Sequence, residues 1–264
     1  MADPDWIAAE YGHETLTLWQ MAADGTVLDQ GTEAHGGRAL AELVPQGVPG
    51  VVSGQGSLPA PAVPAKVPGP EVAATSGALL LLQAVAQAQP VDLLGFEATR
   101  VAGFLVLNPG FDGVICLPGQ TSRWVHISAG EIVSFRSFLT GGLMQSLGGL
   151  PTRGFDKAAL AEAVDRAMSR PSGFAGDLAQ IAAEARLAGL SSEDAATRIG
   201  GLLLGLELAA AKPYWLGQNV ALVADGAFAA PWQAAIEAQG APVVVADGPR
   251  MALEGLKQAW AARG

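Results

Sequence analysis

The chain has 264 residues, of which 50% are hydrophobic and 15% charged, and its net charge is −10. This composition excludes a disordered chain and supplies enough apolar side chains for one or two well-filled cores. The excess of carboxylates, without a cluster of Lys and Arg, argues against a nucleic-acid partner.

Three further features of the sequence bear on where the protein is located and on which structural sites it can contain. We expect a cytoplasmic protein without a membrane partner, because Met1 to Asp5 are acidic where a secretory signal would be basic. The longest apolar run, Gly77 to Val85, is too short to cross a bilayer and predicts a core helix. The single Cys116 lies in a predicted buried strand, which excludes an intramolecular disulfide and a cysteine-based zinc site.

The N-terminal stretch has the pattern of a strand, a polar elbow and a hairpin. Residues 6–9 are apolar and predict a strand, and residues 12–15 (Gly-His-Glu-Thr) predict the elbow. Residues 16–21 predict a second strand. The Asp24-Gly25 turn then leads into a third strand that begins at Thr26.

The next stretch is predicted to change from strand to helix across a proline-rich loop. We expect a short helix within Glu33–Glu42 and a strand over Gly50–Gly54. Ser57 to Pro70 holds five prolines, so neither a helix nor a central strand runs through it. Val72 to Gln89 is rich in Ala and Leu and is predicted to be helical.

A helix and a clear stop follow. Val91–Leu94 predicts a short strand or turn, and Glu97–Leu107 predicts a helix that Asn108-Pro109-Gly110 ends. We place a domain boundary at this break. The predicted domains are therefore residues 1–110 and residues 111–264.

The segment Val114–Phe138 repeats the N-terminal pattern of strand, elbow and hairpin. Its elbow at Gly119 carries the hydroxyls of Thr121 and Ser122, and such a turn directs N–H groups and hydroxyls at whatever lies in front of it. An elbow of this kind is suited to binding a phosphate group. Using one unit twice suggests a duplicated fold with two facing phosphate elbows, and two unrelated β-meanders are the alternative.

The rest of the chain is predicted to be mostly helical. The first helices expected are Ser137–Leu147, Asp156–Met168, Phe174–Leu187 and Ser191–Leu216. The last of these starts with a capping box, Ser191 and Asp194, and contains glycines at 200, 201 and 205 that permit a close backbone approach. The chain closes with strand 219–223, helix 227–239, strand 242–245 and helix 249–262, which suits a mixed sheet flanked by helices.

Three blocks of this sequence resemble the 2-dehydro-3-deoxygalactonokinase family of sugar-acid kinases. The blocks are Ile7–Trp19, Glu97–Leu143 and Gly201–Gly248, which together span nearly the whole chain in the family's order. The resemblance implies an α/β fold of two ribonuclease-H-like domains of the actin-like ATPase and sugar-kinase superfamily. In that fold the domains enclose ATP and substrate in a cleft.

The first elbow departs from the family's D-W-G-S-T-N. Here the run is Glu10-Tyr11-Gly12-His13-Glu14-Thr15. The resemblance implies that Gly12, His13 and Thr15 contact the cofactor and that Glu10 lies near Mg²⁺. Glu14 replaces a hydroxyl and adds repulsion of roughly 1 to 4 kcal/mol against a phosphate. The alternatives are a plain strand-end charge at Glu10 and a polar elbow residue at His13.

The second elbow keeps more of the family's L-P-G-T-H-S-K-W, as residues 117–124 (LPGQTSRW). The resemblance implies that Gly119, Thr121, Ser122 and Arg123 contact phosphates, and an ordinary hairpin turn is the alternative. The family's double Gly on the nucleotide side matches Asp225 and Gly226. Those two residues are therefore expected beside the adenosine.

The family's R-G-E-E-T motif is thinner in this chain, where it matches Gly95-Phe96-Glu97-Ala98-Thr99 and loses its Arg. The resemblance implies that Glu97 is the catalytic base or a substrate ligand. The alternative is a solvated carboxylate in the first turn of a helix. The family's M-T-G-E-L becomes Leu139–Leu143 without the Glu, and its G-M-I-G-S segment is reduced to Ser53–Ser57.

Two function classes stay open from the sequence. The first is a kinase that uses ATP and Mg²⁺ to phosphorylate 2-dehydro-3-deoxy-D-galactonate or a related keto-deoxy sugar acid. The second is a kinase-fold protein without turnover that acts as a binding or regulatory module. The expected partner is a small sugar acid, and a homodimer is the candidate assembly.

Overall fold

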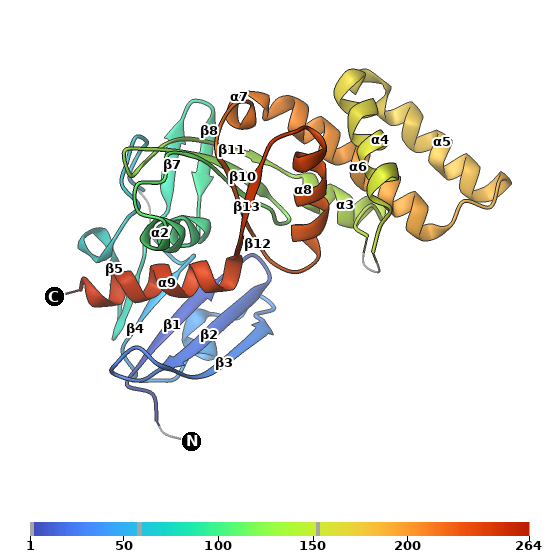
Figure 1. Cartoon of the computed structure of the whole chain (residues 1–264). Helices are drawn as coiled ribbons and strands as arrows, with labels where there is room; N and C mark the ends of the chain where they lie inside the picture. Colours follow the sequence, from blue (N-terminus) through green and yellow to red (C-terminus); the bar gives the residue numbers. More distant parts are fainter. Residues whose placement is uncertain (1–2, 57–59, 152–153, 264) are drawn as a thin grey trace. The chain divides into compact units, whose positions relative to one another are not determined.

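The computed structural model describes residues 3–56, 60–151 and 154–263 (Figure 1). Contacts within the chain divide it into two compact units. Unit 1 contains the residues up to Asp112, Ile127–Phe135 and the residues from Gly248 onward. Unit 2 contains Gly113–His126 and Arg136–Asp247. A division of the chain into domains 1–110 and 111–264 stays a prediction.

Unit 1 is built on a sheet in which β1 is central. The strands are β1 (Trp6–Tyr11), β2 (Thr15–Met21), β3 (Val27–Ala34), β4 (Gly50–Ser53), β5 (Ala74–Ser76) and β6 (Leu79–Leu81), in the order β3-β2-β1-β4-β6-β5. β1 pairs antiparallel with β2 and parallel with β4, and β4 pairs parallel with β6. Residues 6–10 of β1 are all buried, as expected for an apolar strand inside a sheet.

The predicted helix over Val72–Gln89 is wrong. A 3-10 turn (Pro70–Val72) leads into β5 and β6, and β7 (Val85–Ala88) then pairs antiparallel with β8 (Val91–Leu94). The apolar run that suggested a helix has no periodicity, and a run of that length fits a buried strand equally well. Pairing of Leu79–Leu81 with β4 decides the conformation.

The predicted helix within Glu33–Glu42 is mostly wrong as well. Strand β3 continues through Ala34 beside β2, and only the four residues of α1 (Leu40–Leu43) are helical. In the proline-rich segment, Ala65 forms an isolated bridge with Ile132, consistent with a connecting loop. Ser57 and the two residues after it lie outside the described residues.

Two helices of unit 1 lie side by side, α2 (Glu97–Leu107) and α9 (Gly248–Ala261), as Figure 1 shows. Glycines set their separation: a Cβ on Gly103 would lie 1.8 Å from the Met251 carbonyl oxygen, and one on Gly255 would lie 2.1 Å from that of Thr99. α9 also covers β1 and β4. The predicted helix Glu97–Leu107 is confirmed with both of its ends.

Unit 2 repeats the sheet plan of unit 1. Its strands are β9 (Gly113–Leu117), β10 (Ser122–Ser128), β11 (Glu131–Phe138), β12 (Val220–Ala224) and β13 (Val243–Asp247), in the order β11-β10-β9-β12-β13. Again the first strand is central, the next two lie on one side, and parallel strands lie on the other. This shared order favours the duplicated fold over two unrelated meanders.

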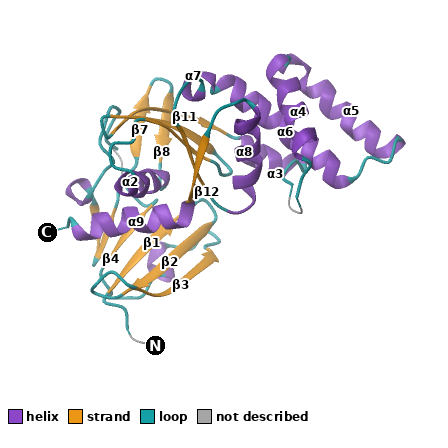
Figure 2. Ribbon diagram, viewed as in Figure 1, coloured by secondary structure: helices purple, strands orange, loops and turns teal. Residues whose placement is uncertain are grey.

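The helices of unit 2 are α3 (Thr140–Leu147), α4 (Lys157–Ser169), α5 (Phe174–Leu187), α6 (Ser192–Ala210), α7 (Lys212–Trp215) and α8 (Gly226–Ala238), together with a 3-10 turn at Pro171–Gly173. Figure 2 shows α4 and α5 beside α6. The predicted close approach is confirmed, since a Cβ on Gly201 would lie 2.7 Å from the Leu160 carbonyl oxygen. The predicted helix Ser191–Leu216 instead breaks at Ala211, because Pro213 cannot continue an α-helix.

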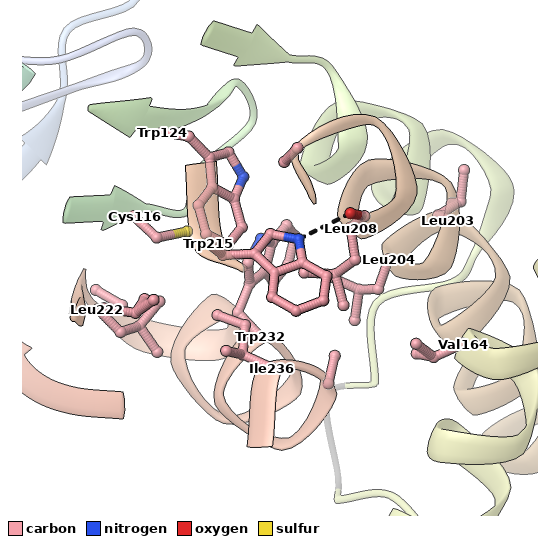
Figure 3. Packing of buried hydrophobic residues seen from close by; sticks show 14 of the residues in the cluster. Cys116, Trp124, Val164, Leu203, Leu204, Leu208, Trp215, Leu222, Trp232 and Ile236 are labelled. Carbon is pink, nitrogen blue, oxygen red and sulfur yellow. Dashed lines mark hydrogen bonds between the residues drawn. The ribbon is translucent and has the colours of Figure 1, made fainter. Parts of the chain in front are cut away.

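Three tryptophans fill the core of unit 2 (Figure 3). Trp124 comes from β10, Trp232 from α8 and Trp215 from α7, and the Trp215 indole N–H donates to the Leu208 carbonyl oxygen at 2.8 Å. Cys116 of β9 lies in the same cluster. Within the described ranges, no helix is long and apolar enough to cross a bilayer.

Candidate active site

The first elbow, residues 12–15, lies at the carboxyl ends of the parallel strands β1 and β4. Gly12 N–H donates to the Thr15 carbonyl oxygen at 2.8 Å, which closes a tight turn. At the end of β4, Gly54 has φ +87°, and a Cβ there would lie 2.0 Å from the Tyr11 carbonyl oxygen. Ligands of α/β proteins bind at this edge of a sheet, so the position suits a site.

The close approach at Gly54 yields a test of the first elbow. Gly54→Ala should destabilise unit 1, because the left-handed backbone and the 2.0 Å contact both exclude a side chain. We expect a loss of roughly 2 kcal/mol or more in the free energy of unfolding, measured by urea denaturation. Gly25→Ala is the matched control, since Gly25 has a similar φ of +85° but open space around it. Equal losses would contradict the packing argument.

Glu97 is held beside the first elbow. It begins α2, and its Oε2 accepts a hydrogen bond from Gly95 N–H at 3.1 Å, while its Oε1 lies 4.0 Å from His13 Nε2. The His13 ring in turn lies edge-on to Phe96 at 5.6 Å. Only 4% of Glu97 is exposed, so it is not the solvated first-turn carboxylate of the alternative interpretation. A positioned, buried carboxylate is suited to accepting a proton.

Glu10 forms a buried ion pair that the sequence did not indicate. Arg100 of α2 donates from Nε to Glu10 Oε2 at 2.8 Å and from an η nitrogen to Oε1 at 2.6 Å. Both residues are buried. The available signal was helical spacing, since Glu97, Arg100 and Phe104 share one buried face of α2. A charge within such a face requires a partner.

This pair bears on the predicted magnesium role of Glu10. Both carboxylate oxygens accept hydrogen bonds from Arg100. A carboxylate oxygen has two acceptor sites, so these bonds do not exclude a further one from a metal-bound water. A position of Glu10 near Mg²⁺ stays a prediction. Over the described ranges, no group of three or more His, Cys, Asp or Glu is arranged to hold a metal ion.

The second elbow, residues 118–121, follows β9 in unit 2 and lies against the start of α3. Gly142 N–H donates to the Gln120 carbonyl oxygen at 2.8 Å. A Cβ on Gly141 would lie 1.9 Å from the Gly119 carbonyl oxygen. Gly119 and Thr121 are half-buried here, so the elbow stays partly accessible. The turn and the helix start together could present N–H groups to a phosphate.

The next two predicted phosphate contacts lie inside unit 2. Ser122 is fully buried, and its hydroxyl donates to Glu207 Oε2 at 2.7 Å. Arg123 is also buried. The accessible part of the second elbow therefore consists of the residues before β10, and Ser122 contributes to its support.

Asp225 and Gly226 lie at the same edge of the unit 2 sheet as the second elbow. Leu222 of β12 pairs with Cys116 of the parallel strand β9, so the carboxyl ends of these two strands are adjacent. Asp225 precedes the first residue of α8, and Gly226 is exposed with φ +53°. The predicted nucleotide-side residues of unit 2 are thus brought to one edge.

Glu207 is a second polar residue that sequence reasoning missed. It lies on α6 with 2% exposure, next to the buried residues Leu203, Leu204 and Leu208 of the same helix. Burial first, and then the charge of Glu207, raise the pKa of the Cys116 thiol well above its ordinary value. Cys116 is therefore a neutral, enclosed thiol and not a candidate nucleophile.

The shifted thiol gives a pH-dependent prediction. The pKa of Cys116 is raised in the folded state, so the unfolded thiol ionises first, and stability is lost as pH rises above the unfolded value of about 8.5. The free energy of unfolding should fall by up to about 1.4 kcal/mol per pH unit more in the parent than in Cys116→Ala. Urea denaturation from about pH 7.5 to about pH 10 measures both slopes. Parallel pH profiles would contradict the assignment.

A cavity of about 360 Å³ in unit 1 lies apart from these residues. Part of its lining is apolar and comes from α2 and α9, including Ala102, Leu105 and Ala259, and none of the predicted site residues line it. We place the candidate residues at the strand ends of each unit instead, because charged and hydrogen-bonding groups gather there within that unit.

Solved structures share this fold over nearly the full chain. A crystal structure from Sinorhizobium meliloti that carries the name of a 2-dehydro-3-deoxygalactonokinase has a TM-score of 0.86 at 23% identity, covering 97% of this chain and 96% of that one. The ADPNP-bound activator of 2-hydroxyisocaproyl-CoA dehydratase from Clostridium difficile has a TM-score of 0.57 at 12% identity, covering 98% and 95%. These likenesses show that the chain shares the fold of both proteins.

The sequence comparisons show the family to which the chain belongs. Residues 44–259 match the family model described as 2-keto-3-deoxy-galactonokinase, so the chain belongs to that family of sugar-acid kinases. It is 25% identical over 96% of both chains to a Rhizobium meliloti (strain 1021) protein named as a probable 2-dehydro-3-deoxygalactonokinase. It is also 28% identical to the 2-dehydro-3-deoxygalactonokinase of Escherichia coli (strain K12), over 58% of this chain and 54% of that protein.

Proposed function

We propose that the chain is an active kinase that transfers the γ-phosphoryl group of ATP to 2-dehydro-3-deoxy-D-galactonate or a related keto-deoxy sugar acid. Membership of the family supports the reaction class. The observation that carries the proposal is Glu97, a buried carboxylate fixed by Gly95 N–H beside the first elbow. It provides a base where the family resemblance expects one.

The proposed reaction assigns one chemical step to Glu97. The acceptor hydroxyl oxygen attacks the γ-phosphorus, the bond to the β,γ-bridging oxygen breaks, and the carboxylate takes the hydroxyl proton. ADP is the leaving group. The N–H groups of the second elbow and of the α3 start would hold the phosphates, and Mg²⁺ would enter bound to ATP. The ADPNP complex of a protein with this fold supports an adenine nucleotide as the co-substrate.

A steady-state assay tests this proposal. Purified protein is supplied with ATP·Mg²⁺ and the sugar acid, and release of ADP is followed through a coupled reaction. We expect ADP release that requires the sugar acid. ADP release without any dependence on the acid would contradict the substrate class, whereas nucleotide binding without turnover would favour the alternative of a binding or regulatory module.

Two carboxylates near the predicted phosphate and adenosine positions are expected to weaken nucleotide binding. Glu14 lies in the first elbow, and Asp225 precedes α8. Replacing them together, as Glu14→Thr with Asp225→Gly, should tighten the Kd for ATP·Mg²⁺ by roughly tenfold, because like-charge repulsion is removed. Titration calorimetry measures both proteins.

The matched control removes the same charge elsewhere. Glu162 of α4 and Glu237 of α8 are exposed, and Glu162→Thr with Glu237→Thr deletes two carboxylates without touching either elbow. Its affinity for ATP·Mg²⁺ should equal that of the parent in moderate salt, where distant exposed charges are screened. Equal tightening in both double variants would show a general effect of net charge and contradict the local argument.

A further inference from the structure

Glu207 places a carboxylate in the apolar core of unit 2. The core residues next to it on α6 include Leu203, Leu204 and Leu208, and they pack among the tryptophans in Figure 3. Moving a carboxylate out of water is costly unless hydrogen-bond donors replace the water. The donors that surround Glu207 therefore show which segments of unit 2 this residue connects.

Three donors meet on this carboxylate. Oε1 accepts from the Trp124 indole N–H at 2.8 Å and from the Trp232 indole N–H at 3.2 Å. Oε2 accepts from the Ser122 hydroxyl at 2.7 Å. Hydrogen bonds to a carboxylate are stronger than those between two neutral groups, so the Glu207 carboxylate restrains the positions of its three donors.

The donors belong to the two segments that form the candidate nucleotide edge of unit 2. Ser122 and Trp124 directly follow the second elbow in sequence. Trp232 lies in α8, the helix that begins at Gly226 immediately after Asp225. One carboxylate thus connects the start of β10, which follows the second elbow, with the middle of α8, the helix that follows β12.

Packing links the same segments a second time, without Glu207. Phe228 in the first turn of α8 lies edge-on to Trp232, with ring centroids 5.7 Å apart. A Cβ built on Gly141 would lie 2.9 Å from the Phe228 ring and 1.9 Å from the Gly119 carbonyl oxygen. The second elbow, the start of α3 and the start of α8 therefore form one packed group.

We propose that Glu207 is a positioning residue that fixes the second elbow and the start of α8 as one preformed edge for the nucleotide. It does not itself touch the nucleotide. The nucleotide part of this inference rests on the proposed function, whereas the positioning part concerns this chain alone. The two parts are tested by separate measurements on the full-length protein.

Hydrogen–deuterium exchange without nucleotide tests the positioning part. Glu207→Gln keeps the shape but loses the charge, and its amide cannot accept from all three donors. Exchange should become faster at residues 118–122 and at residues 225–229 together. Ser122→Ala should affect only the first of these segments and Trp232→Phe only the second. Each of these two variants removes one donor and leaves the Glu207 carboxylate with its other two donors. They therefore test the positioning role even if Glu207→Gln folds poorly.

The controls alter similar groups that make local contacts. Glu193→Gln removes an exposed carboxylate from the first turn of the same helix. Ser146→Ala removes an exposed hydroxyl whose bond is to Gly142 of its own helix. Neither should change exchange in the two segments. Faster exchange in Glu207→Gln that is confined to α6, with residues 118–122 and 225–229 unchanged, would overturn the inference.

Calorimetry with ATP·Mg²⁺ tests the nucleotide part. The Kd should weaken by roughly tenfold in Glu207→Gln and less in Ser122→Ala, while the affinity for the sugar acid stays within about twofold of the parent. Unchanged nucleotide affinity in a variant with loosened segments would overturn the assignment of this edge to the nucleotide. A parent that binds no ATP·Mg²⁺ would overturn the proposed function, and the exchange measurement would still decide the positioning role.

Discussion

Replacing Glu97 by Gln should lower kcat for sugar-acid phosphorylation by a factor of roughly 10² to 10⁴ while the protein stays folded, because a positioned general base contributes that much to a proton transfer. The change keeps the size of the side chain and an oxygen that can still accept from Gly95 N–H. The KM for ATP should change little, since the base acts on the acceptor hydroxyl. Steady-state kinetics in both substrates measures the effect.

Glu71 offers a matched control for this variant. It accepts a hydrogen bond from Gly69 N–H at 3.2 Å, the same contact two residues away that Glu97 makes with Gly95, but it is exposed. Glu71→Gln should therefore retain the activity of the parent. A Glu97→Gln protein with parental kcat would remove Glu97 from the catalytic step, and Glu10 would then be the next carboxylate to test.

Breaking the Glu10–Arg100 pair should cause a large loss of stability. Arg100→Met leaves the buried Glu10 carboxylate without its bidentate partner, and we expect the free energy of unfolding to fall by about 3 to 5 kcal/mol. The double variant Glu10→Gln with Arg100→Met should recover part of this loss, since no buried charge remains. Urea denaturation of the single and double variants gives the coupling between the two residues.

An exposed ion pair in the same unit provides the comparison. Arg38 and Glu33 are 2.7 Å apart, with 46% and 54% of their side chains exposed. Arg38→Met should cost less than about 1 kcal/mol, because water replaces the lost contact. If Arg100→Met were no more destabilising than Arg38→Met, burial would not account for the role of Arg100.

The sequence predicted the elements that have local boundaries. Helix Glu97–Leu107 ends at an Asn-Pro-Gly stop, and the helix after Ser191 begins with a side-chain cap, in which Ser191 Oγ accepts from Asp194 N–H at 3.1 Å. Both signals are encoded within a few residues. The run Gly77–Val85 carried no such signal, and its pairing with a strand nearly thirty residues earlier decided its conformation.

The residues of the candidate site could likewise be predicted from the sequence only where the signal is local. Glu97 and the two elbows could be located from the family resemblance, because they lie in short recognisable blocks. Arg100 was missed because its partner Glu10 is 90 residues away in the sequence. Glu207 was missed because even the donor closest to it in the sequence, Trp232, is 25 residues away. A charged residue at a position that helical spacing places on a buried face was the available signal for both. Such a signal indicates that a partner exists but not which residue it is.

Direct observation of phosphoryl transfer tests the central claim. Purified parent protein is incubated with ATP·Mg²⁺ and 2-dehydro-3-deoxy-D-galactonate, and phosphorus NMR follows the γ-phosphate, with Glu97→Gln and Glu71→Gln measured alongside. We predict that the γ-phosphate signal is replaced by that of a sugar phosphomonoester in the parent and in Glu71→Gln, and far more slowly in Glu97→Gln. Folded parent protein that leaves ATP and every keto-deoxy sugar acid supplied unchanged would contradict the account.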